Sequence, residues 1–273
     1  MNKLGMIGCG AMGTAIVGGL IKNGLISSDR LFVFEPNREK TDQLKKEFGL
    51  NIVESINELT DTCQTIIIAV KPQVMSQVLE ELKSNVVHHL LISIAAGITL
   101  SFLESRIHQA KIVRVMPNTP ARFGMGVSVY APGRLADNTD CMWVEQIFTS
   151  VGKVLKIPEY QMDAVTAVSG SGPAYVFHFI EAMIDAGVML GLTRQDASVL
   201  VIETFRGATE MIRQTGEHPA KLKNEVTSPG GTTAAALYEF EKGALTGIMM
   251  NALIAGARRS AELGEIMEQK SNG

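Results

Sequence analysis

A glycine pattern near the N-terminus constrains the fold more than any other feature of the sequence. The apolar segment of residues 3–7 leads directly into Gly8-Cys-Gly-Ala-Met-Gly13, and a helical run over residues 14–22 follows. A dinucleotide site needs this order, in which Gly8 makes the tight turn, Gly10 admits a pyrophosphate and Gly13 lets the helix pack on the strand. The sequence therefore predicts a Rossmann-type βαβ unit.

The rest of the N-terminal half alternates apolar, β-branched runs with amphipathic helical stretches. This alternation is typical of a mostly parallel sheet that is covered by helices on both faces. The further strands are expected at residues 31–34, 51–53, 65–70, 90–94, 111–115, 126–130 and 153–157, with helices in the connections between them.

Strand signals stop after Pro158. Helices are expected at residues 173–190, 194–215, 219–226 and 232–263, the last with an interruption at Gly243. The predicted fold class is α/β, with a Rossmann-type dinucleotide-binding domain at residues 1–160 and an all-α domain at residues 161–273. Because the first and last of these helices are apolar around much of their circumference, we expect a homodimer that shares helices.

The second strand is followed by Glu35-Pro36-Asn37-Arg38. An acidic residue at a strand end can hold the ribose 2′-hydroxyl of NAD, whereas an arginine just beyond it can pair with the 2′-phosphate of NADP. Glu35 and Arg38 are both candidate cofactor contacts, so these residues leave the choice between NADP(H) and NAD(H) open. Arg38 is explained equally well as a solvated charge at the start of a helix.

Three more strand ends are expected at the edge of the sheet where ligands of such folds bind. Lys71 could act as an acid or steer an anion inward, or it could be a solvated loop lysine. The small residues around Ala96 would let a nicotinamide ring approach the backbone. Asn118 could hydrogen-bond the cofactor or shape the loop between its two neighbouring prolines.

Charge and cysteine content argue against several classes of protein. The 25 Lys and Arg residues against 28 Asp and Glu give a net charge of -3, so no overall basic field would attract nucleic acid or an anionic membrane. Glycines or polar residues interrupt the uncharged stretches 4–21 and 86–103, so neither is read as a signal peptide or a membrane span, and we expect a cytoplasmic protein.

The three cysteines include no C-x-x-C pair, so neither a disulfide framework nor a metal site is predicted. Cys9 is interpreted as a small filler of the glycine turn.

The segment Ser228-Pro-Gly-Gly-Thr-Thr233 lies between two helical runs in the C-terminal third. Its proline fixes one φ angle, its glycines allow backbone geometry closed to other residues, and its threonines open the next helix. Such a loop presents amide N–H groups where the helix dipole favours a carboxylate or a phosphate. A capped helix start after a tight turn would explain the same residues.

Six segments together resemble the pyrroline-5-carboxylate reductase family. They are Gly8-Cys-Gly-Ala-Met-Gly13, Ala69-Val-Lys-Pro72, Ser93-Ile-Ala-Ala-Gly97, Met116-Pro-Asn-Thr-Pro120, Asp163-Ala-Val-Thr-Ala-Val-Ser-Gly-Ser-Gly-Pro-Ala-Tyr175 and Thr227-Ser-Pro-Gly-Gly-Thr-Thr233. The last two are specific to that family. The resemblance implies NAD(P)H-dependent reduction of 1-pyrroline-5-carboxylate to L-proline, the last step of proline biosynthesis. It also implies a helical dimerisation domain and, in some members, assembly of dimers into a decamer.

The resemblance also implies site residues. Thr233 matches the family's threonine that hydrogen-bonds the substrate ring nitrogen, and Ser228, Gly230, Gly231 and Thr232 belong to its carboxylate-binding loop. Glu159 matches a position near the substrate in some members and is otherwise a loop carboxylate. The implied cofactor contacts are Ile7, Gly8, Cys9, Gly10, Ala11, Met12, Val70, Lys71, Ala96 and Asn118. Glu35 stands where many members have a small or polar residue, which calls the usual NADP preference into question.

The implied chemistry suits these residue types. A cyclic imine accepts hydride at carbon while its nitrogen gains or already holds a proton, so the site must orient the ring more than supply a strong base. A threonine hydroxyl is too weak an acid to protonate the ring unaided, so we expect Thr233 to orient the imine and relay a proton from water. One alternative is a β-hydroxyacid dehydrogenase-like reductase, which would need a lysine general acid in the helical domain. Another is a non-catalytic dinucleotide-binding paralogue, which would not oxidise NAD(P)H with pyrroline-5-carboxylate.

Overall fold

The structure, a computed structural model, describes residues 3–270, so the outermost residues of both expected domains lie outside it. Eight strands form one sheet in the order β3-β2-β1-β4-β5-β6-β7-β8. Every neighbouring pair is parallel except β6 and β7, which confirms the mostly parallel sheet. The strands are β1 (Leu4–Ile7), β2 (Leu31–Phe34), β3 (Asn51–Ile52), β4 (Thr65–Ile68), β5 (Leu90–Ser93), β6 (Lys111–Met116), β7 (Gly126–Pro132) and β8 (Gly152–Lys156).

The antiparallel pair arises from a short connection. Residues 117–125, which include a 3-10 turn at Thr119–Phe123, join β6 to β7. A parallel neighbour would require a crossover of about a dozen residues or more. The chain therefore turns back beside β6, and β8 then pairs with β7 in parallel after helix α6 (Asn138–Thr149).

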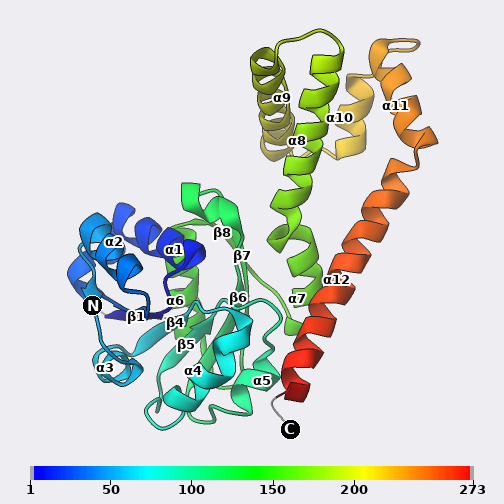
Figure 1. The fold of residues 1–273 in the computed structure, drawn as a ribbon. Coiled ribbons are helices and arrows are strands. Elements are labelled where there is room, and N and C mark those ends of the chain that lie inside the picture. Colours follow the sequence, from blue (N-terminus) through cyan, green and yellow to red (C-terminus); the bar gives the residue numbers. More distant parts are fainter. Residues whose placement is uncertain (1–2, 271–273) are drawn as a thin grey trace. The chain divides into compact units, whose positions relative to one another are not determined.

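Helices cover both faces of the sheet (Figure 1). On one face α1 (Ala11–Lys22), α2 (Arg38–Phe48) and α6 pack on the strands, and on the other face α3 (Ile56–Thr62), α4 (Met75–Leu82) and α5 (Leu100–Glu104) do so. Successive side chains of β4 alternate between the two cores, since Ile67 belongs to the first and Ile66 and Ile68 to the second. Burial on both faces explains why these strands are apolar throughout rather than alternating.

The winding of the sheet reverses at β1. Strands β2 and β3 lie on one side of β1, whereas β4 and the later strands lie on the other. In such sheets ligands bind beyond the carboxyl ends of the strands at this reversal. The register pairs Ile7 with Ile68 and Ile68 with Ser93, so the chain leaves β1, β4 and β5 at one edge.

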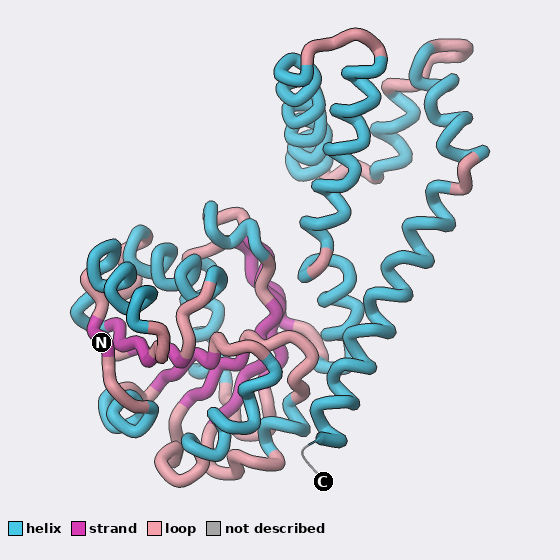
Figure 2. The backbone as a smooth tube through the Cα atoms, viewed as in Figure 1, coloured by secondary structure: helices cyan, strands magenta, loops and turns pink. Residues whose placement is uncertain are grey.

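The chain after Pro158 is helical, as Figure 2 shows in cyan, which confirms the predicted fold class. The helices are α7 (Met162–Val165), α8 (Gly172–Met189), α9 (Arg194–Thr215), α10 (Pro219–Glu225), α11 (Thr232–Lys242) and α12 (Leu245–Lys270), with a π-helical turn at Thr166–Gly170 between α7 and α8. The last helix extends seven residues beyond the predicted end at residue 263, because no glycine or proline that would end it follows Gly264 before residue 270.

The chain folds into two compact units, and the border between them differs from the domain boundary that we expected between residues 160 and 161. One unit, here called the sheet unit, comprises the chain up to Ser171 together with the segment from Ile254 on, and the other, the helical unit, is Gly172–Leu253. The difference has a physical cause, because Met162 is buried in the core of the sheet unit and Met267 of α12 packs against the same core. Local sequence patterns do not report this return of the chain.

Three further observations concern membrane-spanning helices, metal ligands and cysteine pairing. None of the helices in residues 3–270 has the length and hydrophobicity that a membrane-spanning segment needs. The described residues include no group of three or more His, Cys, Asp and Glu side chains that could hold a metal ion. Cys9, Cys63 and Cys141 are all buried and unpaired.

Candidate active site

The glycine turn after β1 has the geometry that a dinucleotide requires. Gly8 has φ +76°, a value that side chains disfavour, and its amide donates to the Phe34 carbonyl at 2.8 Å. A methyl group built on Gly10 would meet no atom within 4 Å, whereas one on Gly13 would lie 2.9 Å from the Met6 sulfur. The surface at Gly10 is therefore open, and Gly13 permits the close packing of α1 on β1.

Helix α1 offers its first amides to a ligand. Its N-cap is Gly10, no side chain caps it, and its first turn contains no acidic residue. The amides at the start of a helix lack carbonyl partners within that helix and lie at the positive end of its dipole. The turn and α1 thus fit a pyrophosphate, and the role of Ile7, Gly8, Cys9, Gly10, Ala11 and Met12 as cofactor contacts stays a prediction.

Glu35 lies against this turn. One carboxylate oxygen accepts a hydrogen bond from the Cys9 amide at 3.0 Å, and the other accepts from the Asn37 amide at 3.1 Å. The carboxylate is therefore fixed between the glycine turn and the start of α2. Arg38, the first residue of α2, is exposed. The sequence indicated both residues but not the Glu35 contact with Cys9.

The Cys9 thiol is buried inside the turn, with 3% of the residue exposed. Burial raises the pKa of this thiol to about 11, and the nearby Glu35 carboxylate acts in the same direction. The thiol is therefore protonated at neutral pH, which favours the interpretation of Cys9 as a filler rather than a nucleophile.

The expected residues after β4 and β5 lie at the same sheet edge. Val70 is half-buried and Lys71 is exposed, at the N-cap of the 3-10 turn Pro72–Val74. Ala96 is exposed, while its neighbours Ala95 and Gly97 are buried. Ala96 is thus the part of its loop that is open to a ligand.

Asn118 is 8% exposed, and its amide joins two distant segments. Its Oδ1 accepts from the Val127 amide at 2.8 Å, and its Nδ2 donates to the Ser169 carbonyl at 3.1 Å. The second bond gives a partner to the Ser169 carbonyl in the π-helical turn, where the regular i→i−4 hydrogen bonds of an α-helix are interrupted. These contacts favour the loop-shaping role among the two that we had left open.

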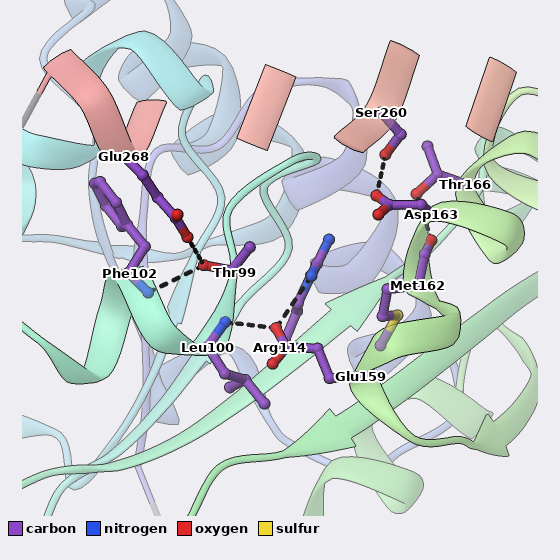
Figure 3. Close-up of polar contacts among 10 residues, drawn as sticks. All are labelled: Thr99, Leu100, Phe102, Arg114, Glu159, Met162, Asp163, Thr166, Ser260 and Glu268. Atoms are coloured by element: carbon purple, nitrogen blue, oxygen red, sulfur yellow. Dashed lines mark hydrogen bonds and ion pairs between the residues drawn. The ribbon is translucent and has the colours of Figure 1, made fainter. Parts of the chain in front are cut away.

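Glu159 is held inside the sheet unit (Figure 3). Its Oε1 accepts from the Leu100 amide at 2.5 Å and from Arg114 Nη1 at 3.1 Å. Arg114 is 5% exposed, so its charge requires this partner. The carboxylate therefore has two structural partners, which agrees with our alternative of a loop carboxylate. The sequence reasoning missed Arg114, although a lone arginine within an apolar strand was a signal for a buried ion pair.

The 228–233 loop begins α11 in the helical unit. Gly230 has φ +68°, and the Gly231 amide donates to the Ser228 carbonyl at 3.1 Å, so the segment is a tight turn. Gly231 is the N-cap of α11, no side chain caps it, and no acidic residue lies in the first turn. A methyl group built on Gly231 would lie 2.6 Å from the Ser228 hydroxyl oxygen, so the turn closes around a glycine.

Thr232 is exposed and Thr233 is half-buried. Among residues 3–270 the hydroxyls of Ser228, Thr232 and Thr233 have no hydrogen-bond partner. Together with the uncapped amides of α11, they form a group of hydrogen-bond donors suited to a small anion.

Two family matches cover these two groups of residues. Residues 3–97 match the family described as NADP oxidoreductase coenzyme F420-dependent, and residues 159–263 match the one described as pyrroline-5-carboxylate reductase dimerisation. A pyrroline-5-carboxylate reductase of Arabidopsis thaliana is 42% identical over 264 residues, which are 96% of this chain and 96% of that relative. This chain belongs to the pyrroline-5-carboxylate reductase family.

Other members of the family agree with this assignment. A pyrroline-5-carboxylate reductase of Escherichia coli K12 is 40% identical over 266 residues, 97% of this chain and 99% of the relative. The crystal structure of Plasmodium falciparum pyrroline carboxylate reductase with NADP bound superposes with a TM-score of 0.89 at 39% identity, covering 96% of this chain and 98% of that one. The chain thus has the family's dimerisation domain as well as its Rossmann-type domain.

Proposed function

We propose that this chain reduces 1-pyrroline-5-carboxylate to L-proline with a reduced nicotinamide dinucleotide, the last step of proline biosynthesis. The observation that carries the proposal is that pyrroline-5-carboxylate reductases match the chain over nearly the full length of both proteins. The matched regions, residues 3–97 and 159–263, include the glycine turn and the 228–233 loop. Both the glycine turn and the 228–233 loop therefore lie within the regions that match the two families.

The 228–233 loop is proposed to hold the substrate. The uncapped amides at the start of α11 and the Thr232 hydroxyl would bind the carboxylate, because both donate hydrogen bonds and the helix dipole favours a negative charge. Binding of the carboxylate there would fix the orientation of the substrate. Holding two reactants in a fixed orientation raises the rate of a reaction that would otherwise need a chance collision in solution.

Thr233 is proposed to act on the ring nitrogen. Thr233 is half-buried, and its hydroxyl has no partner among the described residues, so it is available to accept from a protonated imine or to donate to a neutral one. Since a hydroxyl is a weak acid, Thr233 orients the ring and relays a proton from water rather than supplying it.

The glycine turn, α1, Val70, Lys71 and Ala96 are proposed to hold the dinucleotide. When bound, this cofactor supplies the hydride that reduces the imine carbon. The α1 amides would bind the pyrophosphate, Lys71 would attract its charge, and the open backbone at Ala96 would accept the nicotinamide ring. Arg38 would pair with a 2′-phosphate while the fixed Glu35 carboxylate would repel it, so we propose that the protein uses both NADP(H) and NAD(H).

The oligomer is proposed to be a homodimer formed by the helical unit, and the family resemblance extends this proposal to a decamer. Large apolar side chains exposed on α8 and α9, such as Phe177 and Leu200, support a shared helical interface. The protein is proposed to act in the cytoplasm, with no nucleic-acid or membrane partner.

The proposal is tested by Thr233→Val, which removes the hydroxyl and keeps the side-chain volume, beside Thr233→Ser, which keeps the hydroxyl. We expect Thr233→Val to lower kcat by about 100-fold with little change in the Kd of NADPH, because one oriented hydrogen-bond group typically contributes that much. Thr233→Ser should retain most of the activity. Equal steady-state kinetics in Thr233→Val and the natural protein would overturn the role of Thr233.

A further inference from the structure

Residues 95–99, here called the 95–99 loop, belong to the connection between β5 and α5 and include Ala96. Ala96 is exposed, whereas its neighbours Ala95 and Gly97 are buried. The loop therefore exposes Ala96 to solvent and buries the residues on either side of it. The contacts that fix it come from segments far away in the sequence.

The first contact comes from the end of α12. The Thr99 hydroxyl oxygen accepts from the Phe102 amide at 3.0 Å, which caps α5. The same hydroxyl donates to Glu268 Oε1 at 2.7 Å (Figure 3). One side chain therefore links the cap of α5 to a residue 169 positions later in the sequence.

The second contact is the Glu159 carboxylate. It accepts from the Leu100 amide, the first amide of α5, and is itself held by the buried Arg114 guanidinium of β6. The two carboxylates of Glu159 and Glu268 thus secure consecutive residues, Leu100 directly and Thr99 through its hydroxyl.

The third contact is close packing of α12 on the loop. A methyl group built on Gly264 would lie 3.1 Å from the Gly97 carbonyl oxygen, and one on Gly97 would lie 3.5 Å from Leu263 Cβ. The Ser260 hydroxyl, one helical turn earlier, donates to Asp163 Oδ1 at 2.6 Å and fixes the helix on α7. A side chain on Gly264 would crowd the Gly97 carbonyl, and Gly97 itself has φ +74°, which side chains disfavour.

We propose that the end of α12 braces the 95–99 loop, with Glu268 and Thr99 as positioning residues that hold the Ala96 backbone at the place where the nicotinamide ring docks. This inference rests on the proposed function for the identity of the ring. It assigns a task in the reaction to the Glu268 side chain, which would act through Thr99.

One side of the Thr99–Glu268 contact borders open space rather than packed side chains. A pocket of about 220 Å³ that opens to solvent lies beside the contact, and its lining includes Gly97, Thr99, Arg114 and Glu268. Dense packing would hold a backbone without a polar contact, but a wall that faces a cavity lacks packing neighbours on one side. The Thr99–Glu268 hydrogen bond is therefore expected to matter more here than in a filled core.

The first test uses the cofactor-free protein and amide hydrogen exchange of the peptide that spans residues 94–104. Glu268→Ala should speed exchange in this peptide by about tenfold, because one hydrogen bond to a charged group is lost from a locally opening segment. Glu268→Gln keeps an acceptor for Thr99 and should exchange like the natural protein. The matched control is Glu262→Ala, which removes an exposed carboxylate of the same helix that pairs with Arg259 instead.

The second test separates positioning from binding. Glu268→Ala should lower kcat about tenfold and raise the primary isotope effect with deuterated cofactor, while the Kd of the cofactor changes less than twofold. Thr99→Val, which removes both bonds of the hydroxyl, should reproduce this pattern, and Thr99→Ser should not.

Equal exchange and kinetics in Glu268→Ala and Glu262→Ala would overturn the brace. Equal loss in Glu268→Gln and Glu268→Ala would also overturn it, since the amide preserves the acceptor. A natural protein that fails to oxidise NAD(P)H with pyrroline-5-carboxylate would instead refute the proposed function, and the exchange experiment would still decide whether Glu268 holds the loop.

Discussion

The sheet unit and the helical unit differ in how they bury apolar side chains. In the sheet unit both faces of the sheet are covered, and residues such as Ile66, Ile67 and Phe148 are completely buried. In the helical unit, Gly172–Leu253, the buried apolar residues are Ala197 and Val201 alone. The sheet unit has its own core, whereas the helical unit of a single chain has almost none.

The exposed apolar residues of the helical unit lie on several helices. They include Phe177 and Met183 on α8, Val199 and Leu200 on α9, Tyr238 and Phe240 on α11, and Ile248 and Met250 on α12. Soluble proteins rarely leave so much apolar surface in water unless another surface covers it. The family's dimerisation match over residues 159–263 is the reason to expect a second copy of this chain there.

This contrast has a consequence for function. The glycine turn belongs to the self-contained unit, whereas the 228–233 loop begins a helix of the unit that has almost no core in a single chain. Cofactor binding should therefore survive loss of the oligomer better than substrate turnover does.

The largest expected effect concerns the core of the sheet unit. Ile67→Ala removes a fully buried side chain of β4, and we expect a loss of about 2–5 kcal/mol in the free energy of unfolding because a cavity is left behind. Urea titrations at two protein concentrations measure it. The loss should be independent of concentration, and a strong concentration dependence would contradict a self-contained core.

A smaller effect is expected for Phe177→Asp, which places a charge on an α8 residue that is 64% exposed in the single chain. If a second copy covers this residue, the substitution should weaken self-association by about 2–4 kcal/mol, as for an interface hot spot. Sedimentation velocity measures the shift toward monomer, and Asn224→Asp on exposed α10 is the control with the same change in charge. Turnover should fall while the Kd of NADPH stays within a few-fold. An unchanged oligomer would refute the proposed interface.

The smallest effect is expected for Glu35→Gln in the sheet unit. The amide oxygen still accepts from the Cys9 N–H, whereas the bond from the Asn37 amide is lost. Because the charge is removed, a 2′-phosphate near Arg38 no longer meets a fixed carboxylate. We expect the NADPH affinity to rise about tenfold relative to NADH, or about 1.4 kcal/mol, consistent with one charge pair at a protein surface. Fluorescence titration with each reduced cofactor measures the ratio. No change in the ratio would show that Glu35 does not contribute to cofactor choice.

Local patterns predicted most of the fold. The glycine turn, the strands and the ends of α2 and α9 depend on residues close together in the sequence, such as Gly49 and Gly216, both of which end a helix in the left-handed conformation. Composition and periodicity also indicated the helical C-terminal part and its need for a partner.

The contacts that define the site were not predictable in this way. Glu35 with Cys9, Asn118 with Ser169 and Glu159 with Arg114 join residues 26, 51 and 45 positions apart. In the sequence, each of these polar residues stands alone, and many other residues could have served as its hydrogen-bond partner. The division into compact units was not visible in the sequence for the same reason, because the return of α12 to the sheet unit depends on tertiary packing around Gly97 and Gly264.

The central claim is tested most directly by initial rates with 1-pyrroline-5-carboxylate and each reduced cofactor in parallel, together with quantification of L-proline. We predict that NADPH and NADH are both oxidised and that one proline forms for each cofactor consumed. A folded, oligomeric protein that oxidises neither cofactor, or that consumes one without forming proline, would contradict the account.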